Sequence, residues 1–247
     1  MSKFQLLFKN PEKFIRLVRE HLNVHGKFAH IKRPEYQPRF SKTLSEWVIH
    51  HQNEILTKQV TWMGVPIWKN VLDLHIYQEI VFEQSPDFIV EIGTAYGGCA
   101  LYLAYLCDIL NKGTVVTIDV DHAECVAEHK RIIKITGKSQ NPQVVEQVHR
   151  MVKASSALVI QDGDHSAEMV LQDLNNYADL VPVGSYFIVE DTIADVFNNG
   201  NGVGRSIDGP LCAVERFLAE NTHFVVDKNR ERYLITQNPG GYLKRIL

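Results

Sequence analysis

The chain has 247 residues, of which 45% are hydrophobic and 22% charged, with a formal net charge of −3. This length fits one α/β domain with a leading segment, and the composition is ordinary for a soluble globular protein. The small negative charge gives no general attraction for nucleic acid, and no apolar run reaches the roughly 20 residues of a membrane helix. The apolar run near the start, residues 6–8, is too short for a secretory signal. We therefore expect a cytoplasmic protein that acts on a small molecule.

Residues 1–70 show no strand alternation, and we expect a mainly helical N-terminal extension or cap there. Side chains recur at helical spacing behind Asn10 and Pro11, a cap residue followed by a first-turn proline: Phe14, Leu17, Val18, His21 and Leu22. Docking of this helix on the main domain is the default expectation. Covering the active site and pairing with another subunit stay open as alternatives.

From residue 71 onward, strand and helix patterns alternate. Strands are expected at 88–92, 115–119, 131–135, 157–160, 186–190, 223–226 and 232–236, and helices at 72–84, 98–110, 122–130, 142–153, 167–179 and 210–220. This alternation predicts a parallel sheet covered by helices on both faces. Residues 227–231 resemble a hairpin turn, so the last two strands should be antiparallel. The expected fold is α/β, a doubly wound Rossmann-like sheet of the methyltransferase type with a C-terminal antiparallel hairpin.

Ligands of such sheets lie beyond the carboxyl ends of the strands. The first strand ends in a glycine turn, Glu91-Ile92-Gly93-Thr94-Ala95-Tyr96-Gly97-Gly98. Glycines permit a tight turn close to a ligand, and the next helix offers free N–H groups. The spacing is closer to that of loops that hold S-adenosylmethionine than to the Gly-x-Gly-x-x-Gly of dinucleotide sites. An ordinary strand-to-helix turn is the alternative.

The next two strand ends support an adenosine-type cofactor. Asp119 ends the second strand, where an acid accepts hydrogen bonds from ribose hydroxyls, although it could instead cap a helix, a role that Asp121 fits better. Ser139 follows the third strand, where a contact to the adenine edge would fall. The expected cofactor site comprises Glu91, Gly93, Thr94, Tyr96, Gly97, Asp119, Ser139 and Asp162.

Acidic residues follow the fourth and fifth strands, in Gln161-Asp162-Gly163-Asp164-His165-Ser166 and Val189-Glu190-Asp191-Thr192. Adjacent strands bring these carboxylates together, and like charges so close repel one another unless they are protonated or neutralised. A bound cation explains the cluster, and all-oxygen ligation suits Mg2+. Coordination to a divalent ion also lowers the barrier for deprotonating a hydroxyl group.

Transfer of a methyl group to a hydroxyl also needs a base. His165, three residues beyond Asp162, has an intrinsic pKa of roughly 6.5, near the working pH. A capping or purely structural histidine is the alternative. For Asp164 we favour a structural role or the orientation of His165.

Several motifs in order resemble the cephalosporin hydroxylase-like family, which includes Mg2+-dependent O-methyltransferases of macrolide sugars. They are Thr61-Trp62-Met63-Gly64-Val65-Pro66, Asp73-Leu74-x-x-Tyr77-Gln78-Glu79, Pro86-Asp87-x-x-Val90-Glu91-Ile92-Gly93, Asp162-Gly163-Asp164-His165-Ser166, Gly184-Ser185-Tyr186-x-x-Val189-Glu190-Asp191-Thr192 and Pro239-Gly240-Gly241-Tyr242-Leu243. The resemblance covers about residues 60–247. It implies a class I methyltransferase fold in residues 71–247, with S-adenosylmethionine and Mg2+ as cofactors.

The resemblance also implies roles for single residues. Asp162, Glu190 and Asp191 match the family's metal ligands, and His165 matches its proposed base. The implied reaction is O-methylation of a small-molecule acceptor, a hydroxyl of a sugar moiety or secondary metabolite. We further expect a homo-oligomer and no nucleic-acid or membrane partner.

Two features bear on the acceptor. The glycine- and asparagine-rich stretch from Asp195 to Ser206 is too polar for a core element, and we expect a mobile substrate lid, with a surface loop as the alternative. Trp62, Trp68 and Tyr77 could form an aromatic wall against a ring substrate or pack in the core.

Three other functions compete with this reading. An iron hydroxylase needs two histidines and a carboxylate on one metal, and the only His-x-Glu here is His122-x-Glu124 at an expected helix start. A nucleic-acid amino-methyltransferase usually carries Asn/Asp-Pro-Pro-aromatic where this chain has Asp162-Gly163-Asp164-His165. A non-catalytic nucleoside-binding module would not need the clustered carboxylates or His165.

Overall fold

The computed structural model describes residues 11–12, 14–15, 17–18, 41, 43–153, 155–196 and 208–247. The chain forms two compact units, residues 1–42 and 43–247. In the first unit the described residues 11–12, 14–15 and 17–18 are helical, as expected. His21 and Leu22 lie outside the described residues. The expected domain boundary at residue 70 stays a prediction, and residues 43–70 lie in the second unit.

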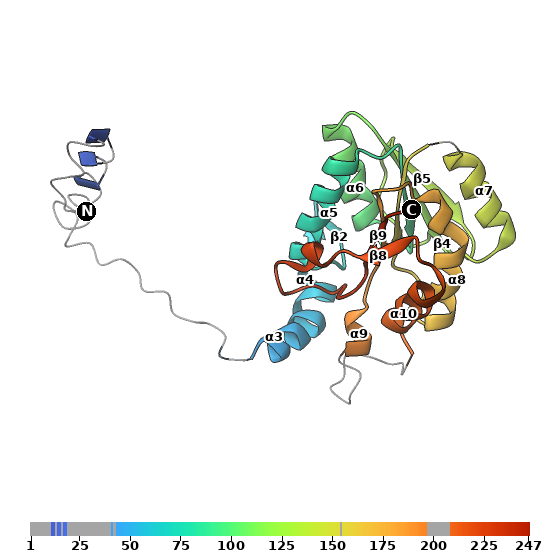
Figure 1. Cartoon of the computed structure of the whole chain (residues 1–247). Coiled ribbons are helices and arrows are strands. Elements are labelled where there is room, and N and C mark those ends of the chain that lie inside the picture. Colours follow the sequence, from blue (N-terminus) through green and yellow to red (C-terminus); the bar gives the residue numbers. More distant parts are fainter. Residues whose placement is uncertain are drawn as a thin grey trace. The chain divides into compact units, whose positions relative to one another are not determined.

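The second unit is built on a seven-stranded sheet (Figure 1). Its strands are β3 (Phe88–Ile92), β4 (Thr114–Asp119), β5 (Ile132–Thr136), β6 (Ala157–Gln161), β7 (Tyr186–Val189), β8 (Phe224–Val226) and β9 (Tyr242–Arg245), in the order β5-β4-β3-β6-β7-β9-β8. The first five are parallel, and β9 pairs antiparallel with both β7 and β8. The predicted doubly wound fold is therefore confirmed.

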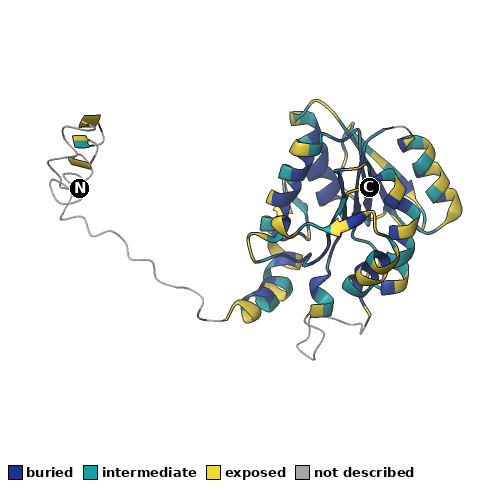
Figure 2. Ribbon diagram, viewed as in Figure 1, coloured by how far each residue is buried: buried dark blue, intermediate teal, exposed yellow. Residues whose placement is uncertain are grey.

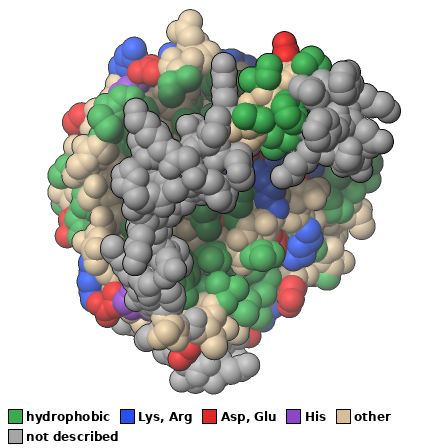
Figure 3. Space-filling model, turned by 90° about the vertical axis from the view of Figure 1, so that its left-hand side faces the viewer, with side chains coloured by type: hydrophobic (Ala, Val, Ile, Leu, Met, Phe, Trp, Pro, Cys, Tyr) green, Lys and Arg blue, Asp and Glu red, His purple; other side chains and the backbone are tan. Residues whose placement is uncertain are grey.

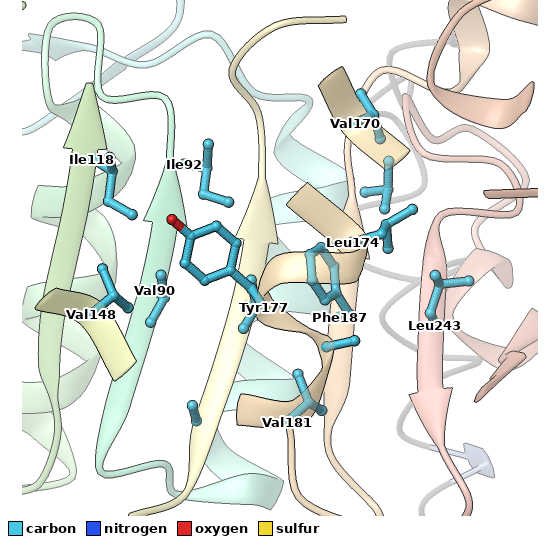
Figure 4. Packing of buried hydrophobic residues seen from close by; sticks show 14 of the residues in the cluster. Val90, Ile92, Ile118, Val148, Val170, Leu174, Tyr177, Val181, Phe187 and Leu243 are labelled. Atoms are coloured by element: carbon cyan, nitrogen blue, oxygen red, sulfur yellow. The ribbon is translucent and has the colours of Figure 1, made fainter. Parts of the chain in front are cut away.

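Helices cover both faces of the sheet. The helices α5 (Val71–Gln84) and α6 (Gly98–Ile109) lie on one face, and α7 (Pro142–Val152), α8 (Ala167–Tyr177) and α10 (Pro210–Glu220) on the other (Figure 1). Successive side chains of a strand point to opposite faces. Ile89 accordingly packs in the core against α5 and α6, whereas Val90 packs in the core that also holds Tyr177 and Phe187 (Figure 4). The central strands β3, β4, β6 and β7 are mostly buried between these two cores (Figure 2).

Residues 43–70 lead into the sheet through short elements. Thr43 and Glu46 form a capping box at the start of α3 (Leu44–His50), which continues as a π-helical turn, η1 (His51–Leu56), and α4 (Thr57–Gln59). The strands β1 (Thr61–Trp62) and β2 (Val65–Pro66) then form a small hairpin. This hairpin was not expected, because two-residue strands are too short to show alternation.

Two predicted elements are wrong. Residues 122–130 are mostly irregular instead of helical, with a turn at residues 123–124, and Val126 donates its N–H to the carbonyl of Tyr96 in the glycine turn (3.2 Å). Residues 232–236 are not a strand, and the last strand is β9. Side chains of α5 hold this segment: Arg232 pairs with Glu79, and Thr236 donates to Asp73 (2.6 Å).

The described surface agrees with the bulk composition. On the face in Figure 3, acidic and basic side chains of the described residues are scattered among hydrophobic ones. All four cysteines are free thiols: Cys99, Cys107, Cys125 and Cys212. Within the described part of the chain, no helix combines the length and apolar character needed to cross a bilayer.

Candidate active site

A cavity of about 490 Å³ opens beyond the carboxyl ends of the parallel strands. Eight of the predicted site residues line it: Gly93, Thr94, Tyr96, Asp119, Ser139, Asp162, His165 and Asp191. These residues come from the ends of five strands, β3 to β7, so the topology gathers them as expected for a doubly wound sheet. Three other predicted residues, Glu91, Gly97 and Glu190, do not line the cavity.

Asp119 holds the glycine turn in place. Its Oδ2 accepts hydrogen bonds from the N–H groups of Thr94 (2.8 Å) and Ala95 (3.2 Å). Its Oδ1 accepts a longer bond from the N–H of Asp121 (3.3 Å). Asp119 thus holds the glycine turn through hydrogen bonds to its backbone. The contact of Asp119 with a ribose stays a prediction.

Gly93 joins the turn to the neighbouring strand end. Its φ is +95°, and a Cβ added there would lie 2.0 Å from the carbonyl oxygen of Asp162. The N–H of Asp162 donates in turn to the carbonyl of Ile92 (2.7 Å). Only a glycine fits this close approach, so the cofactor turn and the first acid of the predicted metal site are packed against each other.

Glu91 lies beneath the turn and not in the cavity. It is 1% exposed and accepts a hydrogen bond from Thr117 Oγ1 (2.6 Å). Burial raises the pKa of Glu91 to about 7, against the opposing effect of that hydrogen bond. In this structure Glu91 contacts β4 through Thr117. Its part in cofactor binding stays a prediction.

The loop after β5 is held by α8. The carbonyl of Ser139 accepts a hydrogen bond from the Tyr177 hydroxyl (2.6 Å), and Gln140 Nε2 donates to Asp173 Oδ1 (2.9 Å). Asp173 is fully buried, and this burial raises its pKa to about 7. The backbone of Ser139 is therefore held in place by α8. The contact of Ser139 with an adenine stays a prediction.

Asp162, His165 and Asp191 form one compact group. Each offers a ligand atom, and these atoms all lie within 4.8 Å of one another. His165 Nε2 lies 3.6 Å from Asp162 Oδ1 and 3.5 Å from Asp191 Oδ2. Asp191 has a left-handed backbone, with φ +54°, directly after β7. The structure thus brings two predicted metal ligands and the predicted base together.

Glu190, the third predicted ligand, pairs with a residue that the sequence analysis missed. Lys69 is 4% exposed, and its ammonium group contacts Asp162 Oδ2 and lies 2.9 Å from Glu190 Oε2. The other oxygen, Glu190 Oε1, is buried without a hydrogen-bond partner among the described residues. Charge balance was the available signal for Lys69, since buried carboxylates require a neighbouring cation.

The electrostatics of the group follow from burial and charge. Burial would lower the pKa of His165, but its interaction with Asp162 and the negative charge of Asp191 outweigh this effect and raise the pKa to about 9. Burial and the charge of Asp162 raise the pKa of Glu190 well above its usual range. The cluster of Asp162, His165, Glu190 and Asp191 therefore holds a proton at neutral pH, or a cation in its place.

These residues fit the two groups that the sequence suggested. Carboxylate oxygens of Asp162 and Asp191 are hard ligands of the kind that Mg2+ prefers, and the unpartnered Glu190 Oε1 offers a third. The adjoining cavity falls within the range of volumes that hold drug-sized ligands. It is also continuous with the glycine turn, where a nucleoside would lie.

The other predictions made from the sequence have different outcomes. Asp164 accepts hydrogen bonds from the N–H (2.8 Å) and hydroxyl (2.6 Å) of Ser166, the N-cap residue of α8, and its predicted structural role stays a prediction. Trp68 lines the cavity, whereas Trp62 packs edge-on against Tyr102. Tyr77 is fully buried, so the expected aromatic wall reduces to Trp68.

Most of the expected lid, residues 197–207, lies outside the described residues. Further cavity residues that were not anticipated include Gln52, Leu56, Thr57 and Met169.

Comparisons with known proteins place the chain in a family. The model of the family described as Rhamnosyl O-methyltransferase/CmcI matches residues 54–246. The rhamnosyl O-methyltransferase of Mycobacterium tuberculosis (strain H37Rv) is 31% identical over 204 residues, which cover 79% of this chain and 82% of that protein. The rhamnosyl O-methyltransferase of Mycobacterium leprae is 32% identical over 166 residues, 65% of this chain and 71% of that protein.

Solved structures agree with the fold. CmcI with Mg and SAM has a TM-score of 0.62 at 21% identity, over 88% of this chain and 90% of that one. The apo structure of CmcI gives a TM-score of 0.60 at 20% identity with the same coverage. The residues that the family model matches, 54–246, include the whole sheet and every described residue of the cavity from Leu56 onward. The chain belongs to the rhamnosyl O-methyltransferase/CmcI family.

Proposed function

We propose that this protein transfers the methyl group of S-adenosylmethionine to a hydroxyl group of a sugar moiety or related small molecule, with Mg2+ bound at the acidic cluster. Family membership supports the reaction type, because the relatives are named rhamnosyl O-methyltransferases. CmcI, which shares the fold, has been solved with Mg and SAM. The assignment of individual residues is a further part of the proposal.

One observation carries the proposal. The glycine turn and the Asp162, His165 and Asp191 group line the same cavity, and the backbones of Gly93 and Asp162 are in contact. A methyl donor held at the turn and an acceptor held at the acidic group would therefore meet within one cavity. Such proximity is what a direct transfer between two bound molecules requires.

The residues divide the work between the two ends of the cavity. We assign Gly93, Thr94 and Asp119 to binding the nucleoside, because they build the turn and its side-chain support. We assign Asp162 and Asp191, with Glu190, to holding Mg2+. When bound, this ion supplies positive charge that lowers the barrier for deprotonating a hydroxyl group.

We assign His165 to taking the proton of the acceptor. Its side chain is 44% exposed towards the cavity, with Nε2 between Asp162 and Asp191. In the reaction, the acceptor oxygen forms a bond to the methyl carbon while the sulfur–methyl bond breaks, and the hydroxyl proton goes to Nε2. With a cation held on Asp162 and Asp191, these carboxylates would raise the pKa of His165 less, and its neutral form, which a base needs, would be favoured.

The remaining cavity wall suits a small amphipathic acceptor. Leu56, Trp68 and Met169 offer apolar contacts, and Gln52 and Thr57 offer polar groups. A sugar ring has both apolar faces and hydroxyl groups, and the relatives' name identifies rhamnose as the first sugar to test. A cytoplasmic location and assembly into a homo-oligomer remain proposals, and light scattering after size-exclusion chromatography tests the second.

Substitution of Asp162 tests the division of labour. Asp162→Ala should abolish methyl transfer to a rhamnosylated acceptor, because the variant loses a metal ligand. It should leave the affinity for S-adenosylhomocysteine within a few-fold, because the carboxylate faces Lys69 and His165. Equal loss of transfer and of nucleoside binding, measured by calorimetry, would contradict this separation.

A further inference from the structure

A buried C-terminal segment, residues 236–241, lies against the turn that carries the predicted metal ligands. Thr236, Gln237 and Asn238 are 9%, 4% and 1% exposed, although they belong to a loop that precedes β9. The segment contributes no side chain to the cavity. Its sequence motif was recognised above, but the proposed reaction gives it no role. We call residues 236–241 the C-terminal brace.

The brace makes three hydrogen bonds to the chain around the turn. Asn238 Oδ1 accepts from the N–H of Asp191 (3.1 Å). The carbonyl of Gln237 accepts from the N–H of Ile193 (3.0 Å), and the carbonyl of Gly241 accepts from the N–H of Val189 (2.8 Å). These bonds bracket residues 189–193 on both sides of Asp191.

Asp191 needs such support because of its backbone conformation. Its φ of +54° lies in the left-handed region, which residues with a Cβ adopt only rarely. The direction of the side chain follows from this backbone, and it places Oδ2 at 3.5 Å from His165 Nε2. A relaxed backbone at Asp191 would turn its carboxylate away from Asp162 and His165.

Asn238 is itself fixed by the surrounding residues. Its side-chain Nδ2 donates to the Tyr77 hydroxyl (3.2 Å), and its backbone N–H donates to Thr236 Oγ1 (2.9 Å). The amide thus uses its oxygen for Asp191 and its nitrogen for α5. An acid of the same shape would add negative charge beside the carboxylates and could not donate to Tyr77.

Asp73 anchors the brace to α5. Its Oδ1 accepts hydrogen bonds from Thr236 Oγ1 (2.6 Å) and the Tyr242 hydroxyl (2.9 Å), and its Oδ2 accepts from the N–H of Gln237 (2.8 Å). Asp73 is 2% exposed, so these bonds are shielded from water. A continuous set of contacts therefore runs from α5 through the brace to Asp191.

We infer that Asn238 is a positioning residue for Asp191, which holds this carboxylate in the orientation needed to bind the divalent ion. This inference rests on the proposed function, because it takes Asp191 as a metal ligand. Partners that orient metal ligands typically change metal affinity by 10- to 100-fold when they are removed. We expect an effect of that size for Asn238, and a smaller one for the hydroxyl of Tyr77.

Calorimetric titration of Mg2+ into the full chain, in the presence of S-adenosylhomocysteine, tests the inference. Asn238→Ala removes the acceptor for the Asp191 N–H, and Tyr77→Phe removes only the hydroxyl that orients Asn238. Asp191→Ala reports whether this residue binds the ion at all. Asn229→Ala, at an exposed asparagine on the 3-10 turn η3 (Lys228–Glu231), is the matched control. The affinity for S-adenosylhomocysteine and the melting temperature are measured for each variant.

The expected result is a graded loss of Mg2+ affinity. Asn238→Ala should raise the Kd for Mg2+ by about 10- to 100-fold, Tyr77→Phe should raise it less, and Asn229→Ala should leave it unchanged. The affinity for S-adenosylhomocysteine should stay within a few-fold in all of them. A loss of nucleoside affinity as large as the loss of Mg2+ affinity in Asn238→Ala would overturn the inference, since it would show a general structural role.

Two further outcomes separate the inference from the proposed function. If Asp191→Ala weakens Mg2+ binding and a folded Asn238→Ala does not, the positioning role is refuted and the metal site stands. If Asp191→Ala leaves Mg2+ affinity unchanged, the metal assignment itself fails, and the inference falls with it.

Discussion

The close contact between the cofactor turn and the strand that carries Asp162 leads to a quantitative prediction for Gly93→Ala. The alanine Cβ would lie 2.0 Å from the carbonyl oxygen of Asp162 and 2.6 Å from its carbonyl carbon. Both are backbone atoms, which cannot move without displacing β6. The substitution therefore combines an unfavourable φ with a steric clash.

Gly184 separates these two effects. Its φ is +91°, close to the +95° of Gly93, but a Cβ there would have no atom within 4 Å. Gly184→Ala should cost about 1–2 kcal/mol of unfolding free energy, which is the cost of the left-handed backbone. Gly93→Ala carries a similar cost plus about 1–3 kcal/mol for overpacking. The difference between the two variants measures the contact alone.

Urea unfolding followed by tryptophan fluorescence provides the comparison. We expect Gly93→Ala to be less stable than Gly184→Ala by about 1–3 kcal/mol. We also expect only Gly93→Ala to lose affinity for S-adenosylhomocysteine, because its clash moves the cofactor turn. Equal destabilisation by the two substitutions would refute the packing of the turn against Asp162.

Three other substitutions follow from the site. His165→Ala should lower the rate of methyl transfer by about 10²–10⁴-fold if it is the base, whereas a rate near that of the wild type would make it structural. Lys69→Met should cost about 3–5 kcal/mol by leaving buried carboxylates unpaired, and added Mg2+ should raise its melting temperature more than that of the wild type; equal rises would contradict this pairing. The raised pKa of Asp173, about 7, means that the folded state holds a proton that the unfolded state releases near pH 4. The contribution of Asp173 to the free energy of unfolding should therefore fall as the pH rises from about 4 to 7. Asp173→Asn should reduce the loss of stability between pH 5 and 8 by about 2 kcal/mol. An unchanged pH dependence of unfolding in this variant would contradict the prediction.

The sequence predicted the sheet well where burial alone decides the structure. The strands around Val90 and Val159 are short apolar runs between turn signals, and both are fully buried at the centre of the sheet. The prediction failed where tertiary contacts outweigh local preference. Residues 122–130 have a helix-forming composition, but they bind the backbone of the glycine turn at Tyr96 instead. Residues 232–236 include the aromatic and β-branched residues that are common in strands, yet side chains of α5 hold them as a loop.

The site shows the same division. Asp162, His165 and Asp191 were predicted because residues at the carboxyl ends of adjacent parallel strands must meet. Lys69 is 93 residues from Asp162 in the sequence, and no local pattern marks it as a partner. Asn238 is 47 residues from Asp191, and the hydrogen bond between its side chain and the backbone N–H of Asp191 leaves no periodic signal in the sequence.

The central claim is that methyl transfer to a sugar hydroxyl depends on a divalent ion at the acidic cluster. The most direct measurement is the transfer of a labelled methyl group from S-adenosylmethionine to a rhamnosylated acceptor by protein treated with EDTA, before and after Mg2+ is added back. We expect no labelled product after chelation and restored transfer with Mg2+, with no restoration in Asp162→Ala. Undiminished transfer in the presence of EDTA would contradict it.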